Sequence, residues 1–475
     1  MAEQQTHLPA ERAALAAAAG ATFLAFLDVT VVNLAFPDLR QDFGSPSIAS
    51  LSWVVTSYAV LFAAVLAPSG RVADIVGHRR LFRIGLLGFV IASAASAIAP
   101  SLWALVLART VQGGTAALMI PAALGLVLIE TAPARRAAAI GAWGASGALA
   151  AAAGPSLGGV LVDAAGWRSV FLINLPLGLL LLAVTRRIPT RAGSGGLTPD
   201  PWSSLQLAFG IGGVVLAITK ASEWGWADAR TVVVSVVAVL LVALSIARSA
   251  RTDVPAVDTT LWRNRRYAAA NVASVAVGAS MYAWMLLGVL WLTSVWGYSE
   301  IRAGLAMSPG ALTAAVTSMV IGKRPSPRGP RTAVFTGAVL MAMTGVWMAS
   351  ELGPEPAFLT LWLGGGLVSG IGIGAAMTGL ATAAALTAPP EKFATATGLN
   401  MTARQVGGAL GIAGLAVLLT GATDVDAFLD VNLLCAGFAA LGAIASLWLG
   451  ERRTAVIPYP TSGDAAELRT RTPAA

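Results

Sequence analysis

The chain is poor in the residues that build metal sites and disulfides. Its 475 residues include one cysteine, Cys435, and two histidines, His7 and His78. One cysteine excludes an intrachain disulfide and a thiolate metal cluster. The two histidines are too far apart for the spacing of a zinc hydrolase. The sequence therefore predicts neither a metal site nor a bound cofactor.

Charged residues are also scarce. They make up 11% of the chain, against 56% hydrophobic residues, and the mean hydropathy is +0.75. Soluble domains carry roughly 25% charged residues, so this composition indicates a polytopic membrane protein. Residues 1–12 are polar, and the apolar run that follows is longer than that of a signal peptide and lacks its cleavage signature. We expect this run to be retained as the first span.

Long apolar runs account for most of the sequence. Runs of about 18 residues or more predict membrane-spanning helices. Because their number is even, both termini are expected on one side. The fourteen predicted spans are 13–36, 51–70, 81–99, 102–129, 138–162, 169–185, 203–222, 231–248, 268–293, 303–322, 332–350, 357–387, 395–420 and 429–449.

The basic residues set the expected orientation. The net charge is +8 and the pI is near 10.3, values that also occur in proteins that bind nucleic acid. With the N-terminus inside, 24 of the 31 Lys and Arg residues fall on the cytoplasmic side and five outside. The positive-inside rule explains this bias without a nucleic-acid partner. We expect an inner-membrane protein with both termini in the cytoplasm.

Residues 141–159 (GAWGASGALAAAAGPSLGG) contain six glycines. Each would cost about 1 kcal/mol in a helix in water, whereas lipid holds such a run helical because the backbone has no other partner. Gly147, Ala151, Gly154 and Gly158 recur at helical spacing and form one face without bulky side chains. This face is expected to pack closely on another helix, which a purely structural seam would also do.

One acidic residue lies deep in a predicted span. Of 23 acidic residues, all except Asp28 fall in loops or at span ends. Asp28 lies about 12 Å from the outer end of its span at 1.5 Å per residue, and Arg109 lies at about the same depth, so the two can be level. An ionisable group inside a span is costly to bury and therefore suggests a function. The hypothesis for Asp28 is a carboxyl group that binds and releases protons. The alternatives are a permanent salt bridge or an Asp28 satisfied by hydroxyls such as that of Thr30.

Arg404 lies in the middle of a span in the second half of the chain, where no acidic residue neighbours it. Two interpretations stay open: Arg404 neutralises an anionic substrate, or it bonds to helix carbonyl groups.

A weak internal repeat indicates two related halves. Gly70 and Arg71 recur 252 residues later as Gly322 and Lys323, in the loop after the second span of a six-span unit. Duplicated transporter halves have this organisation. The predicted division is 1–190, an N-terminal six-helix bundle; 191–250, a linker with two inserted scaffold helices; 251–453, a C-terminal six-helix bundle; and 454–475, a disordered cytoplasmic tail.

Four segments resemble motifs of one transporter family. Residues 154–159 (GPSLGG) resemble motif C of proton-driven drug exporters, and residues 27–37 (LDVTVVNLAFP) resemble a first-span motif of fourteen-span drug:proton antiporters. Residues 108–114 (ARTVQGG) resemble motif B, and residues 70–79 (GRVADIVGHR) resemble the loop motif A. The chain is thereby identified as a member of the major facilitator superfamily, in its multidrug and antibiotic efflux branch of the quaternary-ammonium-pump type.

The loop motif departs from the family pattern. Ile75 and His78 stand at positions that are usually basic, and Ser326 stands in the second-half copy where the first has Asp74. The resemblance then implies a weaker salt-bridge network between the halves, with locking resting mainly on Asp74. We expect His78 to be a solvated loop residue rather than a pH sensor.

The resemblance implies an all-α major facilitator fold of two six-helix bundles plus two inserted helices. It also assigns residues to roles. These are proton coupling at Asp28 and Arg109; the antiporter motif at Gly147, Gly154, Pro155, Gly158 and Gly159; and a gating loop at Gly70, Asp74, Gly77 and Arg79.

A substrate cavity is expected among polar, aromatic and Met side chains of central spans, although interfacial belts and packing explain most such residues. The candidates are Asn33, Trp53, Tyr58, Gln112, Trp143, Tyr282, Trp284, Met377, Asn400 and Arg404.

The sequence thus predicts a proton-coupled antiporter that exports small lipophilic or monocationic compounds by alternating access. We expect a monomer whose partners are its substrate, protons and the bilayer. The alternative is a uniporter or proton-coupled transporter of a metabolite in the same fold. A channel is disfavoured because no ring of like charges is present, and an enzyme because no nucleophile and base pair lies in the spans.

Overall fold

The computed structural model describes residues 2–191, 193, 199–252, 255–256, 258–324, 329–419 and 425–450. Within these ranges fourteen segments are long and apolar enough to cross a membrane, which confirms the predicted number of spans. The predicted tail 454–475 and Ser326 lie outside the described residues. The helices of these spans are α1 (Ala2–Val32), α3 (Ile48–Val76), α4 (His78–Ala97), α5 (Leu102–Glu130), α6 (Arg136–Ala165), α7 (Ser169–Leu172) with α8 (Asn174–Val184), α9 (Pro201–Trp224), α10 (Ala229–Ser249), α12 (Arg265–Leu290), α13 (Glu300–Lys323), α14 (Pro330–Glu351), α15 (Leu363–Leu386), α16 (Phe393–Leu419) and α17 (Val425–Ser446).

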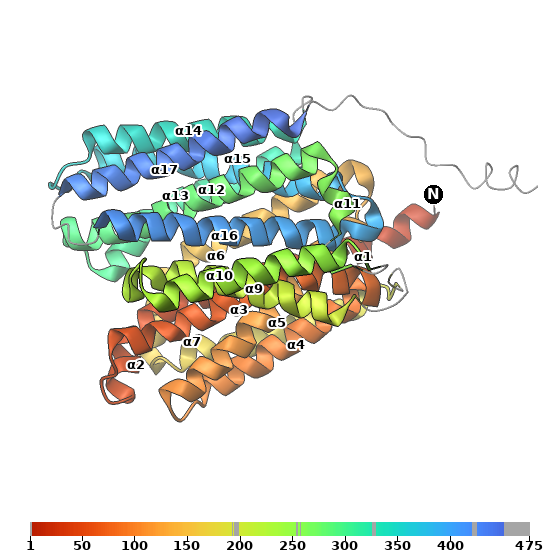
Figure 1. The fold of residues 1–475 in the computed structure, drawn as a ribbon, viewed down its shortest axis with the longest axis horizontal. Coiled ribbons are helices and arrows are strands. Elements are labelled where there is room, and N and C mark those ends of the chain that lie inside the picture. The colour runs from red at the N-terminus through yellow and green to blue at the C-terminus, as the bar shows by residue number, and fades with distance from the viewer. Residues whose placement is uncertain are drawn as a thin grey trace, which may run out of the picture.

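Short helices and turns join or extend these spans. Two are α-helices, α2 (Phe36–Asp42) and α11 (Thr259–Trp262). We call the end of the bundle at which α1 begins, near α11, the proximal face, and the opposite end, which carries α2, the distal face (Figure 1). The remaining segments are η1 (Asn33–Ala35), η2 (Pro133–Arg135), η3 (Thr185–Arg187), η4 (Trp291–Val295), η5 (Phe358–Trp362), η6 (Pro390–Lys392) and η7 (Leu447–Leu449).

Local sequence fixes where several helices begin and end. Ser47 and Ser101 precede α3 and α5, and each hydroxyl accepts a hydrogen bond from the backbone N–H three residues later. Such N-caps satisfy a donor that the helix leaves without an internal partner. Gly77 separates α3 from α4 at φ +103°, a backbone conformation that side chains oppose. The chain therefore reverses sharply at the proximal face.

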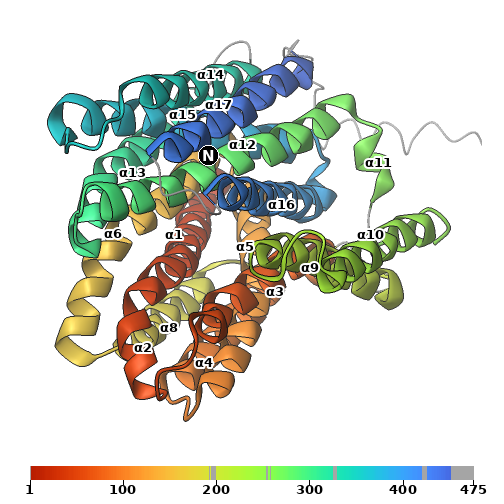
Figure 2. The same ribbon diagram turned by 60° about the vertical axis from the view of Figure 1, so that its left-hand side comes forward.

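The described spans form two groups. Helices α1 to α8 build an N-terminal half and α12 to α17 a C-terminal half, which lie on opposite sides of the molecule in Figures 1 and 2. One hydrophobic core joins side chains of both halves, including Leu124 and Ile140 with Phe393 and Ala394 of α16. The core around α2 and the core around η4 each draw on one half only. The halves therefore share packed core at the proximal face.

The weak sequence repeat corresponds to two similar crossings between the halves. At Gly70 of α3 an added Cβ would lie 2.2 Å from the carbonyl oxygen of Ala394 on α16. At Gly322 of α13 it would lie 2.7 Å from the carbonyl oxygen of Ala137 on α6. Only glycine permits such backbone contact. Each half therefore places one glycine of the repeat against a helix of the other half.

The inserted pair lies across the seam between the halves (Figure 2). Leu207, Ile211 and Val215 of α9 share a core with Ala63 of α3 and Leu399 of α16. Helix α10 packs on α9, and only 17% of its most apolar window is buried. Helix α9 is thus part of the contact between the halves, whereas α10 mostly faces the lipid.

Candidate functional site

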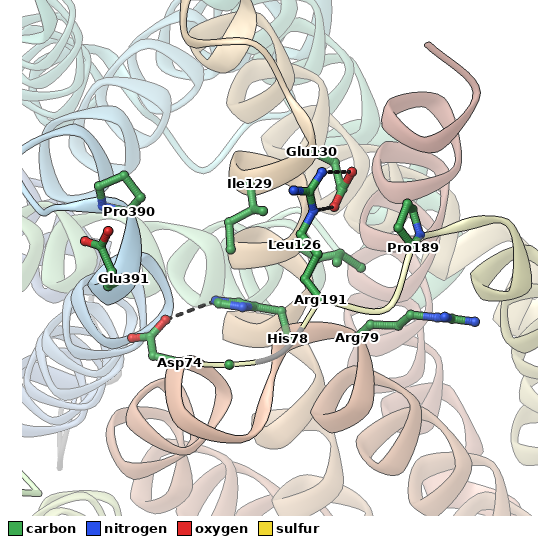
Figure 3. A pocket seen from close by; sticks show the side chains of 11 residues that line it. Asp74, His78, Arg79, Leu126, Ile129, Glu130, Pro189, Arg191, Pro390 and Glu391 are labelled. Carbon is green, nitrogen blue, oxygen red and sulfur yellow. Dashed lines mark hydrogen bonds and ion pairs between the residues drawn. The ribbon is translucent and has the colours of Figure 1, made fainter. Parts of the chain in front are cut away.

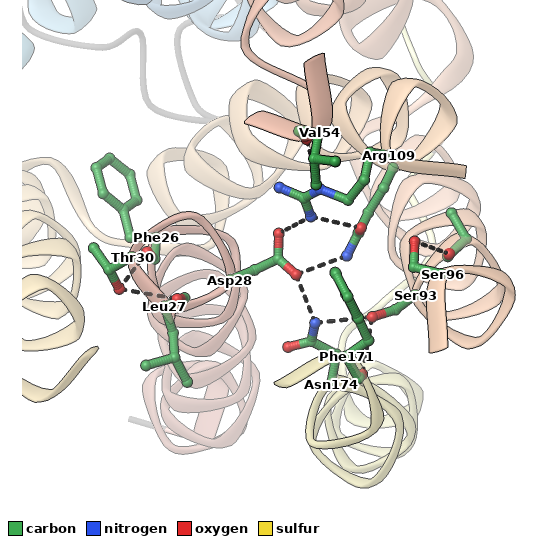
Figure 4. A network of polar contacts seen from close by, with 12 residues as sticks. Phe26, Leu27, Asp28, Thr30, Val54, Ser93, Ser96, Arg109, Phe171 and Asn174 are labelled. Atoms are coloured by element: carbon green, nitrogen blue, oxygen red, sulfur yellow. Dashed lines mark hydrogen bonds and ion pairs between the residues drawn. The ribbon is translucent and has the colours of Figure 1, made fainter. Parts of the chain in front are cut away.

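Asp28 and Arg109 meet, as their predicted depths indicated (Figure 4). The Arg109 guanidinium donates through Nη1 to Asp28 Oδ2 and, at 2.7 Å, to Gln112 Oε1. Gln112 in turn donates to Asp28 Oδ1 at 2.9 Å. Asp28 is 1% exposed and Arg109 and Gln112 are fully buried, so the ion pair is closed to water.

A third donor reaches Asp28 from α8. Asn174 Nδ2 lies 2.8 Å from Asp28 Oδ1 and 2.9 Å from Ser93 Oγ on α4. The Ser93 hydroxyl also lies 2.9 Å from the carbonyl oxygen of Phe171, to which it donates. Sequence analysis missed Asn174 and Ser93. The signal for Asn174 is an amide within the apolar run FLINLPLGLLLL.

The alternative in which the Thr30 hydroxyl satisfies Asp28 is not realised. Thr30 Oγ1 donates to the carbonyl oxygens of Phe26 and Leu27, at 3.1 and 2.9 Å, on its own helix. This bonding to the preceding turn is the usual behaviour of a threonine inside a helix. Asp28 is satisfied instead by donors from α5 and α8.

Aromatic rings and a backbone carbonyl complete the surroundings of Arg109. Its guanidinium lies 4.4 Å from the ring centroid of Tyr58, and its Nε donates to the carbonyl oxygen of Val54 at 3.3 Å. Both residues belong to α3. Side chains of α5 and α8 therefore contact the Asp28 carboxylate of α1 directly, and groups of α3 and α4 contact Arg109 and Asn174 in turn. In such a network a change in the charge of Asp28 would act on more than its direct partners.

The small-residue face of α6 has α1 as its partner helix. A Cβ at Gly154 would lie 2.1 Å from Thr30 Oγ1, and one at Gly158 would lie 2.7 Å from Leu34. Gly147 is less crowded, because a Cβ there would lie 3.5 Å from its nearest neighbour, Thr22. The motif thus packs against the segment of α1 that carries Asp28.

Helix α6 also contacts the other half. A Cβ at Gly304 of α13 would lie 2.3 Å from Pro155, and one at Gly159 would lie 3.5 Å from Ile301. One helix therefore packs on α1 through one face and on α13 through another. It links the Asp28 helix to the C-terminal half.

The last turn of α3 and the first turn of α4 form a second polar cluster, at the proximal face; the predicted gating loop is helical except at Gly77. Asp74 accepts hydrogen bonds from the backbone N–H groups of Ala394 at 3.1 Å and Thr395 at 2.8 Å, and from the Thr395 hydroxyl. These groups open α16, where a carboxylate stabilises the positive end of the helix dipole. Asp74 is 2% exposed, so the N-terminal half caps a helix of the C-terminal half away from water.

The prediction that His78 is solvated is wrong. Its side chain is 9% exposed, and Nε2 lies 3.0 Å from Asp74 Oδ1 (Figure 3). A Cβ at Gly125 of α5 would lie 2.2 Å from the imidazole. The ring is buried because the turn at Gly77 directs it inward and Gly125 leaves room for it.

A cavity of about 270 Å³ adjoins Asp74 and His78 (Figure 3). Arg191 pairs there with the buried carboxylate of Glu130 at 2.6 Å, a hydrogen bond that raises the pKa of Arg191 above its ordinary value. Arg79 donates through Nε to the carbonyl oxygen of Thr185 at 3.0 Å. The start of α4 is therefore tied to the segment that follows α8.

The predicted cavity residues do not all come together. Tyr58 and Gln112 belong to the Asp28 cluster, and Trp143 is 5% exposed within the shared core. Asn400 joins α16 to α12 through a 2.8 Å hydrogen bond to Ser274, and Trp284 stacks on Trp362 inside the C-terminal half. The side chain of Asn33 is outside the described part. Trp53 is considered next.

Trp53 lies beside a lysine near the end of α9, within the predicted span 203–222. Lys220 Nζ of α9 lies 4.8 Å from the ring centroid of Trp53 and 3.0 Å from Ser52 Oγ. It also pairs with Glu223 at 2.6 Å, and its own side chain is 2% exposed. A buried cation thus fastens the inserted helix α9 to α3.

Three candidates of the C-terminal half do meet. Tyr282 of α12, Met377 of α15 and Arg404 of α16 lie together, with the hydroxyl of Tyr282 donating to Gln405 Oε1 at 2.7 Å. Gln405 was not singled out from the sequence.

Known proteins resemble this chain over most of its length. The sequence profile of the Major Facilitator Superfamily matches residues 18–412 and 273–468. The tetracenomycin C resistance and export protein of Streptomyces glaucescens is 32% identical over 434 residues, which cover 88% of this chain and 78% of that protein. The puromycin resistance protein pur8 of Streptomyces alboniger is 35% identical over 408 residues, which cover 85% and 80%.

A solved structure shares the fold. The crystal structure of the human organic anion transporter MFSD10 (TETRAN) superposes with a TM-score of 0.65, covering 92% of this chain and 99% of that one. The sequence identity is 16%, so the likeness concerns the fold.

Proposed function

Because the chain belongs to the major facilitator superfamily and is a multi-pass membrane transporter, we propose that it is a proton-coupled antiporter that exports small lipophilic compounds across the cytoplasmic membrane. The proximal face is then cytoplasmic, with both termini on that side, and the protein acts as a monomer. The names of the relatives, which are resistance and export proteins for antibiotics, support export as the direction.

The observation that carries the proposal is the buried Asp28 cluster. Protonation of Asp28 would remove the anion that Arg109, Gln112 and Asn174 now stabilise. A buried arginine that loses its counter-ion is strongly destabilised, which favours a rearrangement. Binding of a proton and a conformational change are therefore linked free energies.

The contacts of α1 can couple protonation of Asp28 to a movement of the two halves. Asp28 and Thr30 lie on one helix, and Thr30 packs against Gly154 of α6. Helix α6 packs against α13 of the other half through Pro155 and Gly304. A shift of α1 upon protonation would thus reach the interface along which the two halves rock.

The cluster narrows the expected substrates. The sequence-based prediction let a monocationic substrate compete with the proton at Asp28. In the structure Asp28 is 1% exposed, and its oxygens accept from three side chains. A cation would have to displace this network, so we propose lipophilic compounds without a cationic group in preference to monocations.

The test compares Asp28→Asn with Asp426→Asn, an exposed carboxylate on α17 that lies outside the cluster. A susceptibility panel in an efflux-deficient host, including puromycin and tetracenomycin C, selects a transported compound. Its uptake is then measured in everted membrane vesicles with an acid interior. We expect Asp28→Asn to abolish the gradient-driven part and Asp426→Asn to match the wild type.

Two results would count against the proposal. If Asp28→Asn retained gradient-driven uptake, the coupling carboxyl would lie elsewhere. If no compound in the panel were exported and a metabolite were taken up instead, the alternative of a metabolite transporter in the same fold would hold.

A further inference from the structure

Arg404 is a basic residue near the middle of the membrane. It lies eleven residues from Phe393 and fifteen from Leu419, the ends of α16. At 1.5 Å per residue it is therefore about 16 Å from one end of the helix and about 22 Å from the other. A guanidinium at this depth stays charged and is costly to bury without an anionic partner.

The two deep arginines differ in how their charge is met. Arg109 is fully buried against Asp28. Arg404 is only partly buried, and among the described residues no carboxylate forms an ion pair with it. Its recorded side-chain contacts are Met377 Sδ, 3.9 Å from Nη1, and the neighbouring Tyr282 hydroxyl. A thioether is a weak acceptor, and a neutral hydroxyl does not cancel a full positive charge.

The alternative of helix carbonyl partners is not realised. Within the described part of the chain, no hydrogen bond joins the Arg404 guanidinium to a carbonyl oxygen. Its charge is thus left available to a partner that the described residues do not supply.

Glycines on two helices allow this arrangement. A Cβ at Gly278 of α12 would lie 2.5 Å from the carbonyl oxygen of Arg404 and 3.1 Å from its Cγ. A Cβ at Gly408 of α16 would lie 2.5 Å from the ring of Tyr282. Because both positions lack a side chain, Arg404 and Tyr282 lie against the opposing backbones of α12 and α16.

Gln405 adds donors beside Arg404. Its Oε1 accepts the hydroxyl proton of Tyr282 at 2.7 Å, which leaves the amide NH₂ as the free end of the side chain. Gln405 is partly exposed, as is Met377. An arginine fork, an amide donor and apolar side chains together suit a flat lipophilic molecule that carries one anionic oxygen group.

We propose that Arg404 and Gln405 form an anion-binding subsite that takes a carboxylate, sulfonate or ionised phenol on the transported compound. The subsite deepens the proposed function, since it states which lipophilic compounds the transporter prefers, and it rests on that function only for the direction of transport. In this proposal Asp28 binds the proton, and Arg404 binds the anionic group of the substrate.

The test uses two probes that share one ring system. 8-Anilinonaphthalene-1-sulfonate carries a sulfonate, and N-phenyl-1-naphthylamine lacks it. Equilibrium binding of each to the purified full chain in lipid nanodiscs is measured by fluorescence, with empty nanodiscs subtracted. The variants are Arg404→Gln, Arg404→Lys and, as a matched loss of one positive charge, Arg302→Gln at the exposed start of α13.

We expect Arg404→Gln to weaken sulfonate binding by about tenfold or more, as loss of a charge-assisted hydrogen bond does. Binding of the neutral probe should stay within about twofold, which also shows that the variant is folded. Arg404→Lys should restore much of the affinity, and Arg302→Gln should resemble the wild type. If Arg404→Gln lost affinity equally for both probes, or lost none for the sulfonate probe, the proposed subsite would be refuted.

The experiment separates the subsite from proton coupling. Equilibrium binding needs no proton gradient, so failure of Asp28 as the coupling residue would leave its outcome unchanged. Conversely, unchanged sulfonate binding by Arg404→Gln would refute the subsite while gradient-driven export remained intact.

Discussion

Asp74, in the last turn of α3, accepts hydrogen bonds from both the backbone N–H and the side-chain hydroxyl of Thr395 in the first turn of α16. The two residues belong to different halves of the transporter. This bond therefore exists only while the halves are closed at the proximal face, and it stabilises that state relative to the opposite one.

We predict that Asp74→Asn opens the proximal face. Hydrogen bonds to a charged group contribute about 1.5 to 3 kcal/mol, so the equilibrium should shift by about tenfold or more. The readout is labelling of Leu66→Cys, buried opposite Gly398, by a membrane-impermeant maleimide in everted vesicles. The native Cys435 is 2% exposed and should give little background. Equal labelling rates with and without Asp74→Asn would show that this bond does not hold the face closed.

Two glycines of the antiporter motif should respond differently to alanine. At Gly154 the added Cβ would lie 2.1 Å from Thr30 Oγ1, whereas at Gly159 it would lie 3.5 Å from Ile301. Overpacking of this kind costs about 1 to 3 kcal/mol. We expect Gly154→Ala to lower the melting temperature and drug resistance, and Gly159→Ala to preserve both. The seam would be unimportant for packing if the two variants had the same melting temperature.

Asn174 and Ser93 should act as one unit on Asp28. Asn174 contacts the carboxylate directly, and within the described part of the chain Ser93 forms hydrogen bonds only with the Asn174 amide and a carbonyl oxygen. Asn174→Ala should reduce gradient-driven uptake, and adding Ser93→Ala should reduce it little further. The coupling energy in the double-mutant cycle should fall in the range of about 0.5 to 3 kcal/mol. Additive effects would mean that Ser93 does not work through Asn174.

In the Lys220–Glu223 ion pair of α9, replacing the exposed Glu223 should destabilise the protein more than replacing the buried Lys220. The Glu223 side chain is 40% exposed, whereas that of Lys220 is 2% exposed beside Trp53. Glu223→Gln leaves a buried cation without its counter-ion, while Lys220→Met removes that cation and keeps an apolar stem. We expect Glu223→Gln to lower the melting temperature in detergent more than Lys220→Met does. The reverse order would indicate that the Trp53 contact dominates.

The orientation of the protein follows from its basic residues. We predict that reporter domains fused at Ala475 and within residues 186–202 both register in the cytoplasm. A reporter after Gly166, in a loop at the distal face, serves as the opposite control. A periplasmic signal at Ala475 would contradict an even number of spans with an internal N-terminus.

The sequence by itself determined the number of spans and the depth of the buried charges. Apolar runs must be helical in lipid because the backbone has no other hydrogen-bond partner, so their length alone gives the spans. Depth follows from the fixed rise of the helix, which is why the meeting of Asp28 and Arg109 was predictable. The glycine spacing on α6 likewise required a close partner helix, although it did not identify α1.

Tertiary structure decided which polar groups are buried together. Asn174 and Ser93 are far from Asp28 in sequence, and a single amide in an apolar run does not reveal its partner. His78 resembles a loop residue and Lys220 lies at the end of a predicted span, yet the turn at Gly77 and the packing of α9 on α3 bury them. For Arg404 the sequence left open whether the guanidinium bonds to helix carbonyl groups. The packing of the helices decides this point, because among the described residues it gives the guanidinium no carbonyl partner.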